Sequence, residues 1–271
     1  RLFHWDSLRH AVINADDAFG RTLLTQPQPQ VQACSYSLQP AGGDVSATQL
    51  TASLAGLHLT VHTPWGTGQI DSPLLGRFNA ANLLACLAAL GVQGVPLAEA
   101  CAVLGLIEPA RGRMERRGGG GLPLVVVDYA HTPDALETAL PPLREVCRAD
   151  RELVWVFGCG GDRDAGKRPL MGEIAQRVAD LAIVTNDNPR SEAPAEIVAA
   201  IVAGMNPLKP FEVTLDRATA IKWAIQHARV GDIVLIAGKG HETYQDIAGV
   251  RHAFSDIAVA EAALSVWTPP A

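Results

Sequence analysis

Four loops in the second half of the chain concentrate side chains that can bind ions, transfer protons or let a ligand approach the backbone. Each loop follows a short apolar run, and their sequences are DYAHTPD at 128–134, GCGGDRD at 158–164, TNDNPRSE at 185–192 and GKGHE at 238–242. Ordinary turns are built from Gly, Pro, Asn, Asp and Ser and carry fewer ionisable groups. The four loops therefore predict a ligand site.

The third loop places a carboxylate, an amide and a guanidinium group within four residues, as Asp187, Asn188 and Arg190. Pro189 stiffens the backbone between them. Arginine can bind a carboxylate through two parallel hydrogen bonds, while the Asp and Asn oxygens can accept hydrogen bonds from an ammonium group. The loop thus favours a zwitterion such as an amino acid. An Asx turn beside a surface arginine is the alternative.

The second loop resembles a phosphate-binding loop without matching it fully. Residues 161–168 fit the pattern G-x-x-x-x-G-K after a predicted strand. However, Arg168 occupies the Ser/Thr position that would hold Mg²⁺, and the carboxylates of Asp162 and Asp164 would face the phosphates. We expect a Gly-rich loop whose Arg163 and Lys167 serve another anion, with a true phosphate loop as the alternative.

The first and fourth loops contribute histidines, glycines and one further carboxylate. Gly238 and Gly240 allow a ligand to approach the backbone closely, and Glu242 could pair with an ammonium group. His131 and His241 fall at strand ends, where a histidine is more often a hydrogen-bonding loop residue than a catalyst. These two loops extend the predicted site without defining its chemistry.

An alternating pattern of strands and helices positions these loops. Apolar runs rich in β-branched residues predict strands buried on both faces, at 124–128, 153–157, 181–185 and 233–237. Helices are predicted at 133–148, 168–179, 195–203, 217–228 and 257–267. Thr132 is the expected N-cap of the first helix, and Pro133 is its first residue. The pattern predicts a doubly wound, mostly parallel Rossmann-like sheet, in which ligands bind at the carboxyl ends of the strands.

The first half of the chain is mixed. Alternating apolar and polar residues at 50–66 predict half-exposed strands and hairpins, and the apolar spacing predicts helices at 79–90 and 96–103. Asn79 and Asn82 lie at the start of the first helix, where they could cap it or present amides to a purine; the residues alone favour capping. Basic and then glycine-rich residues predict a boundary near 111, dividing the chain into domains 1–110 and 111–271.

Composition excludes several classes of protein. The 271 residues include 22 Lys+Arg and 28 Asp+Glu, a net charge of −6, and 48% hydrophobic residues, so wholesale disorder is excluded. The pI of about 5.7 and the absence of a basic run argue against nucleic-acid binding. No stretch suits a membrane span or a signal peptide, so we expect a cytoplasmic protein. The five scattered cysteines suggest neither disulfides nor a zinc site.

Six motifs in a fixed order resemble those of the Mur ligases, the amide ligases of bacterial peptidoglycan synthesis, and especially the diaminopimelate-adding members. They are GRFNAAN at 76–82, GRME at 112–115, DYAHTPD at 128–134, GCGGDRD at 158–164, DNPR at 187–190 and GKGHE at 238–242. The resemblance covers essentially the whole chain. Each motif is weak alone, but six in the family's order are hard to produce by chance.

The resemblance implies an α/β fold in which a C-terminal Rossmann-like domain follows the last part of a mixed α/β ATP-binding domain. It also implies a longer parent protein. The family's UDP-sugar domain, phosphate loop, Mg²⁺ ligands and carbamylated lysine lie upstream of a Leu-Phe pair resembling Leu2-Phe3. We therefore assign no catalytic residue and no metal ligand to this chain itself.

The resemblance also implies residue roles. Asn79 and Asn82 would contact the adenine of ATP, and Asp128 and His131 would act at the nucleotide as the domains close. The remaining matches would form a diaminopimelate pocket. In it Arg190, assisted by Arg163, binds the distal carboxylate, and Glu242 and Gly238 hold the distal ammonium group. The full pocket would comprise Arg163, Asp187, Asn188, Arg190, Gly238 and Glu242.

The implied reaction adds meso-2,6-diaminopimelate to UDP-N-acetylmuramoyl-L-alanyl-D-glutamate through an acyl phosphate, with ATP and Mg²⁺ as cofactors. We expect a monomer with these small-molecule partners, and no nucleic acid or membrane among them. Two alternatives stay open. One is a related ligase, such as a folylpolyglutamate synthetase or another Mur ligase, that uses a different amino acid. The other is a Rossmann-like nucleotide-binding module or small kinase using residues 161–167.

Overall fold

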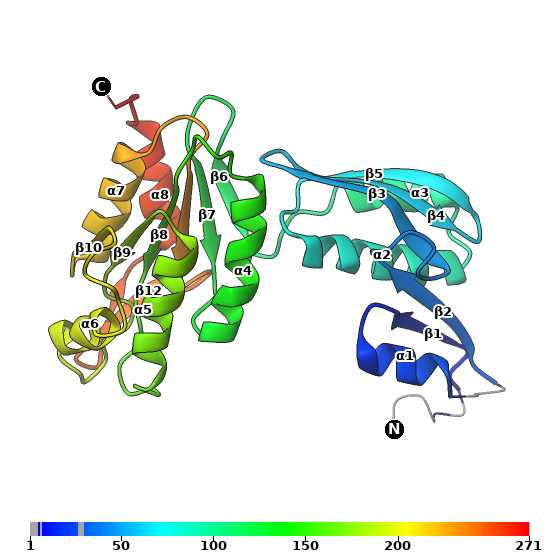
Figure 1. Cartoon of the computed structure of the whole chain (residues 1–271), viewed down its shortest axis with the longest axis horizontal. Helices are drawn as coiled ribbons and strands as arrows, with labels where there is room; N and C mark the ends of the chain where they lie inside the picture. Colours follow the sequence, from blue (N-terminus) through cyan, green and yellow to red (C-terminus); the bar gives the residue numbers. More distant parts are fainter. Residues whose placement is uncertain (1–4, 6, 27–29, 271) are drawn as a thin grey trace. The chain divides into compact units, whose positions relative to one another are not determined.

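The computed structural model describes residues 5, 7–26 and 30–270, which form two compact units, 1–108 and 109–271. The division falls between Glu108 and Pro109. Leu2 and Phe3, the pair that resembles the Leu-Phe of the Mur ligases, lie outside the described residues. Figure 1 shows the elements of both units.

The first unit contains a five-stranded mixed sheet in the order β1-β2-β3-β4-β5. Its strands are β1 (His10–Asn14), β2 (Gln32–Ser37), β3 (Val45–Ser53), β4 (Gly56–Thr63) and β5 (Gly66–Ser72). The first three pair in parallel and the last two are antiparallel. The predicted hairpins are confirmed, whereas β1 and β2 were not predicted.

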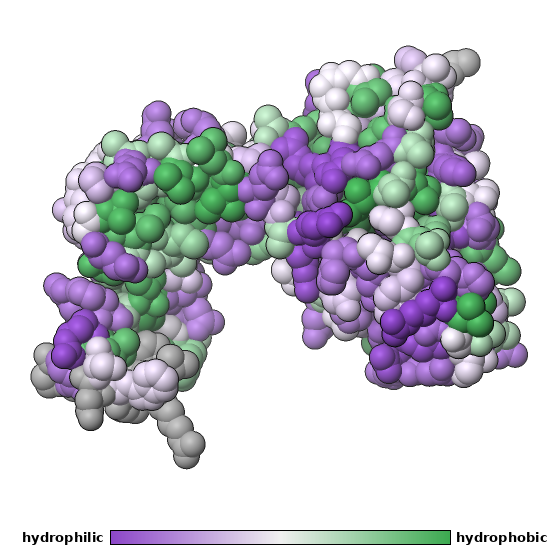
Figure 2. Space-filling model, turned by 180° about the vertical axis from the view of Figure 1, so that it is seen from behind, coloured by the Kyte–Doolittle hydropathy of each residue, from purple (hydrophilic) through white to green (hydrophobic). Residues whose placement is uncertain are grey.

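Helices α2 (Arg77–Val92) and α3 (Leu97–Gly105) bury the apolar face of this sheet, and the short helix α1 (Ala18–Leu24) packs on β1. In α2, Leu83, Leu84 and Leu87 are almost fully buried, and they share a core with Leu59 and Ile70 of the sheet. Figure 2 shows apolar residues on the surface in the region of α3, where Val103, Leu106 and Ile107 are exposed.

The second unit is a doubly wound α/β sheet in the order β10-β9-β8-β11-β7-β6. All strands are parallel except the edge strand β6 (Glu115–Gly118). The others are β7 (Leu124–Asp128), β8 (Leu153–Phe157), β9 (Leu181–Val184), β10 (Phe211–Val213) and β11 (Ile233–Ala237). The four predicted strands are confirmed. The edge strands β6 and β10 were missed because they are short and carry charged residues.

Five helices cover the two faces of this sheet (Figure 1). They are α4 (Pro133–Val146), α5 (Lys167–Val178), α6 (Pro194–Val202), α7 (Arg217–His227) and α8 (Asp256–Ser265). From β7 to β10 the chain moves in one direction along the sheet, so right-handed crossovers place α4, α5 and α6 on one face. The return to β11 reverses that direction and places α7 on the other face, beside α8.

Because β7, β8, β9 and β11 run in parallel, their carboxyl ends lie along one edge of the sheet. All four motif-bearing loops leave from this edge. A small hairpin of β12 (Tyr244–Ile247) and β13 (Val250–Ala253) follows the last of them and was not predicted. The parallel sheet thus gathers segments that are up to 110 residues apart in the sequence, from Asp128 to Gly238.

Candidate functional site

The centre of the loop cluster is Lys239, whose side chain is fully buried. Its Nζ lies 2.9 Å from Asn188 Oδ1, 2.9 Å from Glu242 Oε2 and 3.7 Å from Asp187 Oδ1. A buried ammonium group is costly unless charged and polar partners surround it. Lys239 therefore joins the loop after β9 to the loop after β11. Its place in the GKGHE motif was the only sequence signal for this role.

Asn188 is fully engaged with the protein's own groups. Its Nδ2 donates to Glu242 Oε2 at 2.9 Å, and its Oδ1 also accepts from the backbone amide of Asp246 at 2.9 Å. From the sequence we expected this side chain to accept a hydrogen bond from a ligand's ammonium group. In the structure it holds Glu242 and Lys239 in place instead, because a buried amide must satisfy both its donor and its acceptor.

Asp187 is also buried, at the base of the cluster. Burial raises the pKa of its carboxyl group above 3.8, and the nearby cations Arg217 and Lys239 oppose that rise. A Cβ atom added to Gly238, which has φ +120°, would lie 2.6 Å from Asp187 Oδ2. Gly238 is therefore required by the close packing of the two loops. Asp187 is therefore a buried residue that supports the site. The presence of Arg217 beside it was not predicted from the sequence.

Glu242 is the more accessible carboxylate of the cluster, with 20% of its side chain exposed. Burial would raise its pKa, but hydrogen bonds from Asn188 and Lys239 outweigh burial and lower the pKa below 4.5. Both hydrogen bonds reach Oε2. Glu242 is therefore held as an anion at the surface of the cluster, where it could meet a cationic group.

The two arginines predicted to bind a carboxylate both lie near Gly160. A Cβ at Gly160 would lie 2.9 Å from Arg190 Nη1 and 3.7 Å from Arg163 Cγ. Arg190 is half-buried and donates from Nη1 to the carbonyl oxygen of Gly161 at 2.6 Å, whereas Arg163 is exposed. The Arg190 guanidinium at Gly160 and the carboxylate of Glu242, whose pKa that guanidinium helps to lower, form a site with both signs of charge.

The β12–β13 hairpin fixes the backbone of Arg190. The Arg190 amide donates to Asp246 O at 3.0 Å, and the Ala248 amide donates to Arg190 O at 2.7 Å. These bonds hold Arg190 in the left-handed region, at φ +51°. A non-glycine residue adopts this conformation only where the surroundings impose it. The unpredicted hairpin therefore sets the direction of a predicted site residue.

Phosphate-cradle geometry is absent from the loop at 161–168. The backbone amides of Gly161, Asp162 and Gly166 donate to Asn188 O, Glu192 Oε1 and Asp164 Oδ1, respectively, at 2.6–2.9 Å. Amides that would cradle phosphate are thus occupied by the protein's own acceptors. Arg168 is buried and pairs with Glu192 at 2.8 Å rather than facing a ligand. The loop acts as a wall of the cluster.

This wall gives a pH-dependent contribution to stability. Hydrogen bonds from the Arg168 side chain and the Asp162 amide lower the pKa of Glu192 below its ordinary value of 4.5. A carboxylate with a lowered folded-state pKa stabilises the folded state above pH 4.5, and the stabilisation is lost as the pH falls below it. Urea unfolding of Glu192→Gln should therefore show a shallower loss of stability between pH 5 and pH 3. The exposed Glu196→Gln variant should follow the parent curve, and an equal curve for Glu192→Gln would refute the assignment.

Asp128 and His131 lie in the turn after β7. Both carboxylate oxygens of the buried Asp128 accept backbone hydrogen bonds, from Ala130 at 2.7 Å and Met114 at 2.8 Å. The exposed His131 has Nδ1 2.7 Å from Tyr129 O, and its own carbonyl accepts from Lys167 Nζ at 2.8 Å. Asp128 thus shapes the turn, while His131 is the accessible group of the pair.

An aromatic cluster surrounds Tyr129 in the same turn. Its ring centroid lies 4.7 Å from that of His131 and 5.4 Å from that of His241, and the Arg113 guanidinium lies 4.8 Å above it. Gly112 allows this packing, because a Cβ there would lie 2.1 Å from the His241 amide nitrogen. The structure therefore brings His131 and His241 to one ring, although they are far apart in sequence.

Asn79 and Asn82 lie in the first turns of α2, in the other unit. The helix begins directly after Gly76, and no side chain makes a capping hydrogen bond there. Asn79 Nδ2 donates to Leu75 O at 2.8 Å, and Asn82 Nδ2 donates to Asn79 Oδ1 at 3.3 Å. The capping interpretation favoured by the sequence is therefore wrong. The two amides form a pair, and that of Asn82 is exposed.

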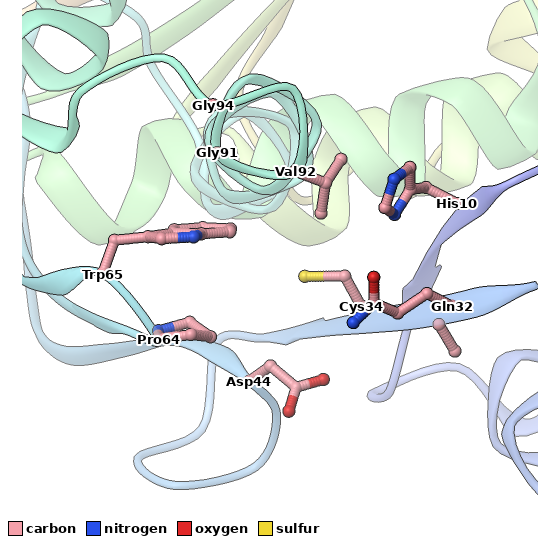
Figure 3. A pocket seen from close by; sticks show the side chains of 10 residues that line it. His10, Gln32, Cys34, Asp44, Pro64, Trp65, Gly91, Val92 and Gly94 are labelled. Carbon is pink, nitrogen blue, oxygen red and sulfur yellow. The ribbon is translucent and has the colours of Figure 1, made fainter.

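The first unit also contains a cavity of about 360 Å³ between the β1–β2 edge and the end of α2 (Figure 3). Its walls include His10, Cys34, Asp44 and Trp65.

Within residues 5, 7–26 and 30–270, no cluster of three His, Cys, Asp or Glu side chains could hold a metal ion. The same residues include no helix long and apolar enough to cross a membrane. All five cysteines are free thiols.

A mixed α/β unit followed by a doubly wound unit with these loops matches the class of ligases to which the motifs point. The pattern of the Mur ligase middle domain matches residues 1–90, and that of the Mur ligase, glutamate ligase domain matches residues 112–240. The chain belongs to the Mur ligase family. The family resemblance inferred from the motifs is therefore confirmed.

Curated relatives at high identity share one name, UDP-N-acetylmuramoyl-L-alanyl-D-glutamate–2,6-diaminopimelate ligase. The chain is 58% identical to that of Chromobacterium violaceum over 98% of its own length and 54% of the relative's. It is 50% identical to that of Pseudomonas aeruginosa over its whole length and 55% of the relative's. The chain thus spans about half the length of the curated relatives it matches.

Solved structures agree with the fold. A structure of a ligase with the same name superposes with a TM-score of 0.76 at 42% identity, covering 97% of this chain and 54% of the other. A MurF ligase from Thermotoga maritima superposes with a TM-score of 0.62 at 16% identity, over 86% of this chain and 51% of the other. At that identity the likeness shows the fold alone.

Proposed function

We propose that this chain is the amino-acid-binding part, with a portion of the ATP-binding part, of a ligase that adds meso-2,6-diaminopimelate to UDP-N-acetylmuramoyl-L-alanyl-D-glutamate. The observation that carries the proposal is the arrangement at Gly160. The Arg190 guanidinium and the aliphatic part of the Arg163 side chain lie near this glycine, and Glu242, hydrogen-bonded to Asn188 of the Arg190 loop, supplies the opposite charge. The distal end of diaminopimelate carries a carboxylate and an ammonium group, which match these charges.

The choice of diaminopimelate over lysine follows from Arg190. Lysine has the distal ammonium group but no distal carboxylate, so it would leave the half-buried guanidinium of Arg190 without its partner. Leaving one member of a buried charged pair alone costs on the order of 2–5 kcal/mol. Lysine would leave Arg190 without a carboxylate partner, whereas diaminopimelate provides one. The site therefore disfavours lysine as well as favouring diaminopimelate.

In the proposed reaction, the side-chain carboxylate of D-glutamate attacks the γ-phosphorus of ATP, giving an acyl phosphate and ADP. An uncharged amine of diaminopimelate then attacks the acyl carbon, the bond from that carbon to the phosphate oxygen breaks, and the proton lost by the nitrogen ends on the released phosphate as the amide forms. The residues of this chain bind and orient the amine donor. Placing reactants in line supplies much of the acceleration in such reactions.

Nucleotide binding is proposed at two places. The exposed amide of Asn82, next to Asn79, would contact adenine, and the exposed His131 would approach the nucleotide from the turn that Asp128 shapes. The described residues offer no cluster that fits Mg²⁺. We therefore derive no step through the metal from this chain. We further propose a monomer that acts in the cytoplasm, where its nucleotide substrates are found.

The alternatives differ in what supports them. A related ligase using another amino acid would share the fold, but it would need both charges of this site only if that amino acid carried a carboxylate and an ammonium group at its distal end. A small kinase or nucleotide-binding module using residues 161–167 is disfavoured because the amides of that loop already bind internal acceptors. The proposed function is therefore the one that uses the whole loop cluster.

The direct test is phosphate release from ATP and Mg²⁺ with UDP-N-acetylmuramoyl-L-alanyl-D-glutamate as acceptor. Meso-diaminopimelate and L-lysine are offered separately, to this chain and to the full-length protein that carries it. We expect release only by the full-length protein and only with diaminopimelate. Release with lysine alone would overturn the amino-acid assignment, and no release with either amino acid would favour the alternative ligases.

A further inference from the structure

Arg217 and Asp256 form a fully buried ion pair beneath the loop cluster. Arg217 Nε lies 2.8 Å from Asp256 Oδ1, and Nη2 lies 2.8 Å from Oδ2, so the pair is bidentate. Both side chains have 0% exposure. Arg217 is the first residue of α7, where the helix dipole disfavours a cation. A buried cation at this position needs several specific partners to be tolerated.

The remaining contacts of this guanidinium reach two separate loops. Nη1 donates to the carbonyl oxygen of Asn186 at 3.1 Å, and Nη2 donates to that of Ala237 at 3.0 Å. These carbonyl groups belong to the residues directly before Asp187 and Gly238. Arg217 therefore hydrogen-bonds to the backbone at the start of both loops that form the proposed diaminopimelate site.

The two loops leave strands that are not neighbours. In the sheet order, β8 lies between β9 and β11, so no ladder hydrogen bond sets the spacing of these two strand ends. The spacing is nevertheless tight, because a Cβ at Gly238 would lie 2.6 Å from Asp187 Oδ2 and 3.9 Å from Arg217 Nη2. A planar guanidinium presents five donors in a fixed fork, so Arg217 can bind Asp256 and both carbonyl groups at once in one defined geometry.

We propose that Arg217 is a positioning residue that sets the distance between the Asp187–Arg190 loop and the Gly238–Glu242 loop, with Asp256 fixing the guanidinium plane. Arg217 touches no substrate. This inference rests on the proposed function for its substrate, but its geometric basis is independent of that function. The distance that it sets separates Arg190 from Glu242, the two groups proposed to bind opposite charges of one ligand.

The test uses Arg217→Lys in the full-length protein. Lysine keeps the charge opposite Asp256 but cannot also donate to both carbonyls. We expect the KM for diaminopimelate to rise about 10-fold to 100-fold, since misplacement by about 1 Å is enough for such a loss, while kcat and the KM for ATP stay within about 3-fold. Ile225→Val, equally buried on α7, is the matched control and should leave both KM values unchanged.

Hydrogen exchange on this chain separates failure of the inference from failure of the proposed function. In Arg217→Lys, amides at 186–192 and 238–246 should exchange faster than in the parent, while those of α4 should not change. Unchanged exchange in these loops, or an equal rise in both KM values, would overturn the positioning role. Faster exchange in an enzyme that does not use diaminopimelate would overturn the proposed function and leave the positioning role standing.

Discussion

Replacing Arg190 by alanine in the full-length protein is expected to raise the KM for meso-diaminopimelate on the order of 100-fold, with the KM for ATP little changed. The half-buried guanidinium would be lost, and with it the partner of the distal carboxylate. The backbone at φ +51° is no more strained with alanine than with arginine, so the effect belongs to the side chain. Steady-state kinetics with each substrate varied in turn measures both constants.

Two further variants serve as comparisons for Arg190→Ala. Arg163→Ala should have a smaller effect in the same direction, because Arg163 is exposed and water screens its charge. Arg148→Ala, whose side chain is 74% exposed away from the loops, should change neither constant. The preference for diaminopimelate over lysine should also narrow in Arg190→Ala. Parallel rises in the KM for ATP and for diaminopimelate would contradict a specific role of Arg190.

Replacing Lys239 by methionine is expected to lower the free energy of unfolding of the second unit by about 3–5 kcal/mol. Methionine fills a similar volume but leaves the carboxylates of Asp187 and Glu242 without their common cation. Asn188 would also lose one of the two donors at its Oδ1, the other being the Asp246 amide. Urea unfolding followed by circular dichroism measures the loss.

The pH dependence of this loss identifies its origin. Without Lys239 the pKa values of Asp187 and Glu242 should rise, since both pKa values are held down in part by that cation. Protonation then relieves the repulsion, so the destabilisation should be smaller at pH 4 than at pH 8. Lys222→Met, at an exposed position of α7, should cost less than about 0.5 kcal/mol. A pH-independent loss in Lys239→Met would point to packing instead.

The interior of the second unit was largely predictable from the sequence. The runs that became β7, β8, β9 and β11 are apolar on both faces, because a parallel sheet covered by helices excludes water from both sides. Elements without such a pattern were missed. The hairpin β12–β13 is mostly exposed and polar, and nothing in its composition shows that its partner is the backbone of Arg190.

The candidate site was predicted as a set of residues but not as an arrangement. Arg163, Arg190 and Glu242 were expected together, and the structure brings them to one edge of the sheet. Internal donors occupy the groups expected to bind a ligand, because Asn188 Oδ1 accepts two hydrogen bonds from the protein and each carboxylate oxygen of Asp128 accepts one. Which polar groups bind one another depends on contacts between residues far apart in the chain.

The sequence by itself determined the family, the parallel sheet and the loops that carry polar chemistry. Apolar periodicity and motifs can be recognised along the chain without knowing which distant residues touch. Only the tertiary structure decided that Lys239 and Arg217 are buried and bridge separate loops. Lysine and arginine are ordinarily exposed, and a lone residue carries no sign of burial. Their place inside the protein depends on acceptors that distant strands bring together, so it exists only once the sheet has formed.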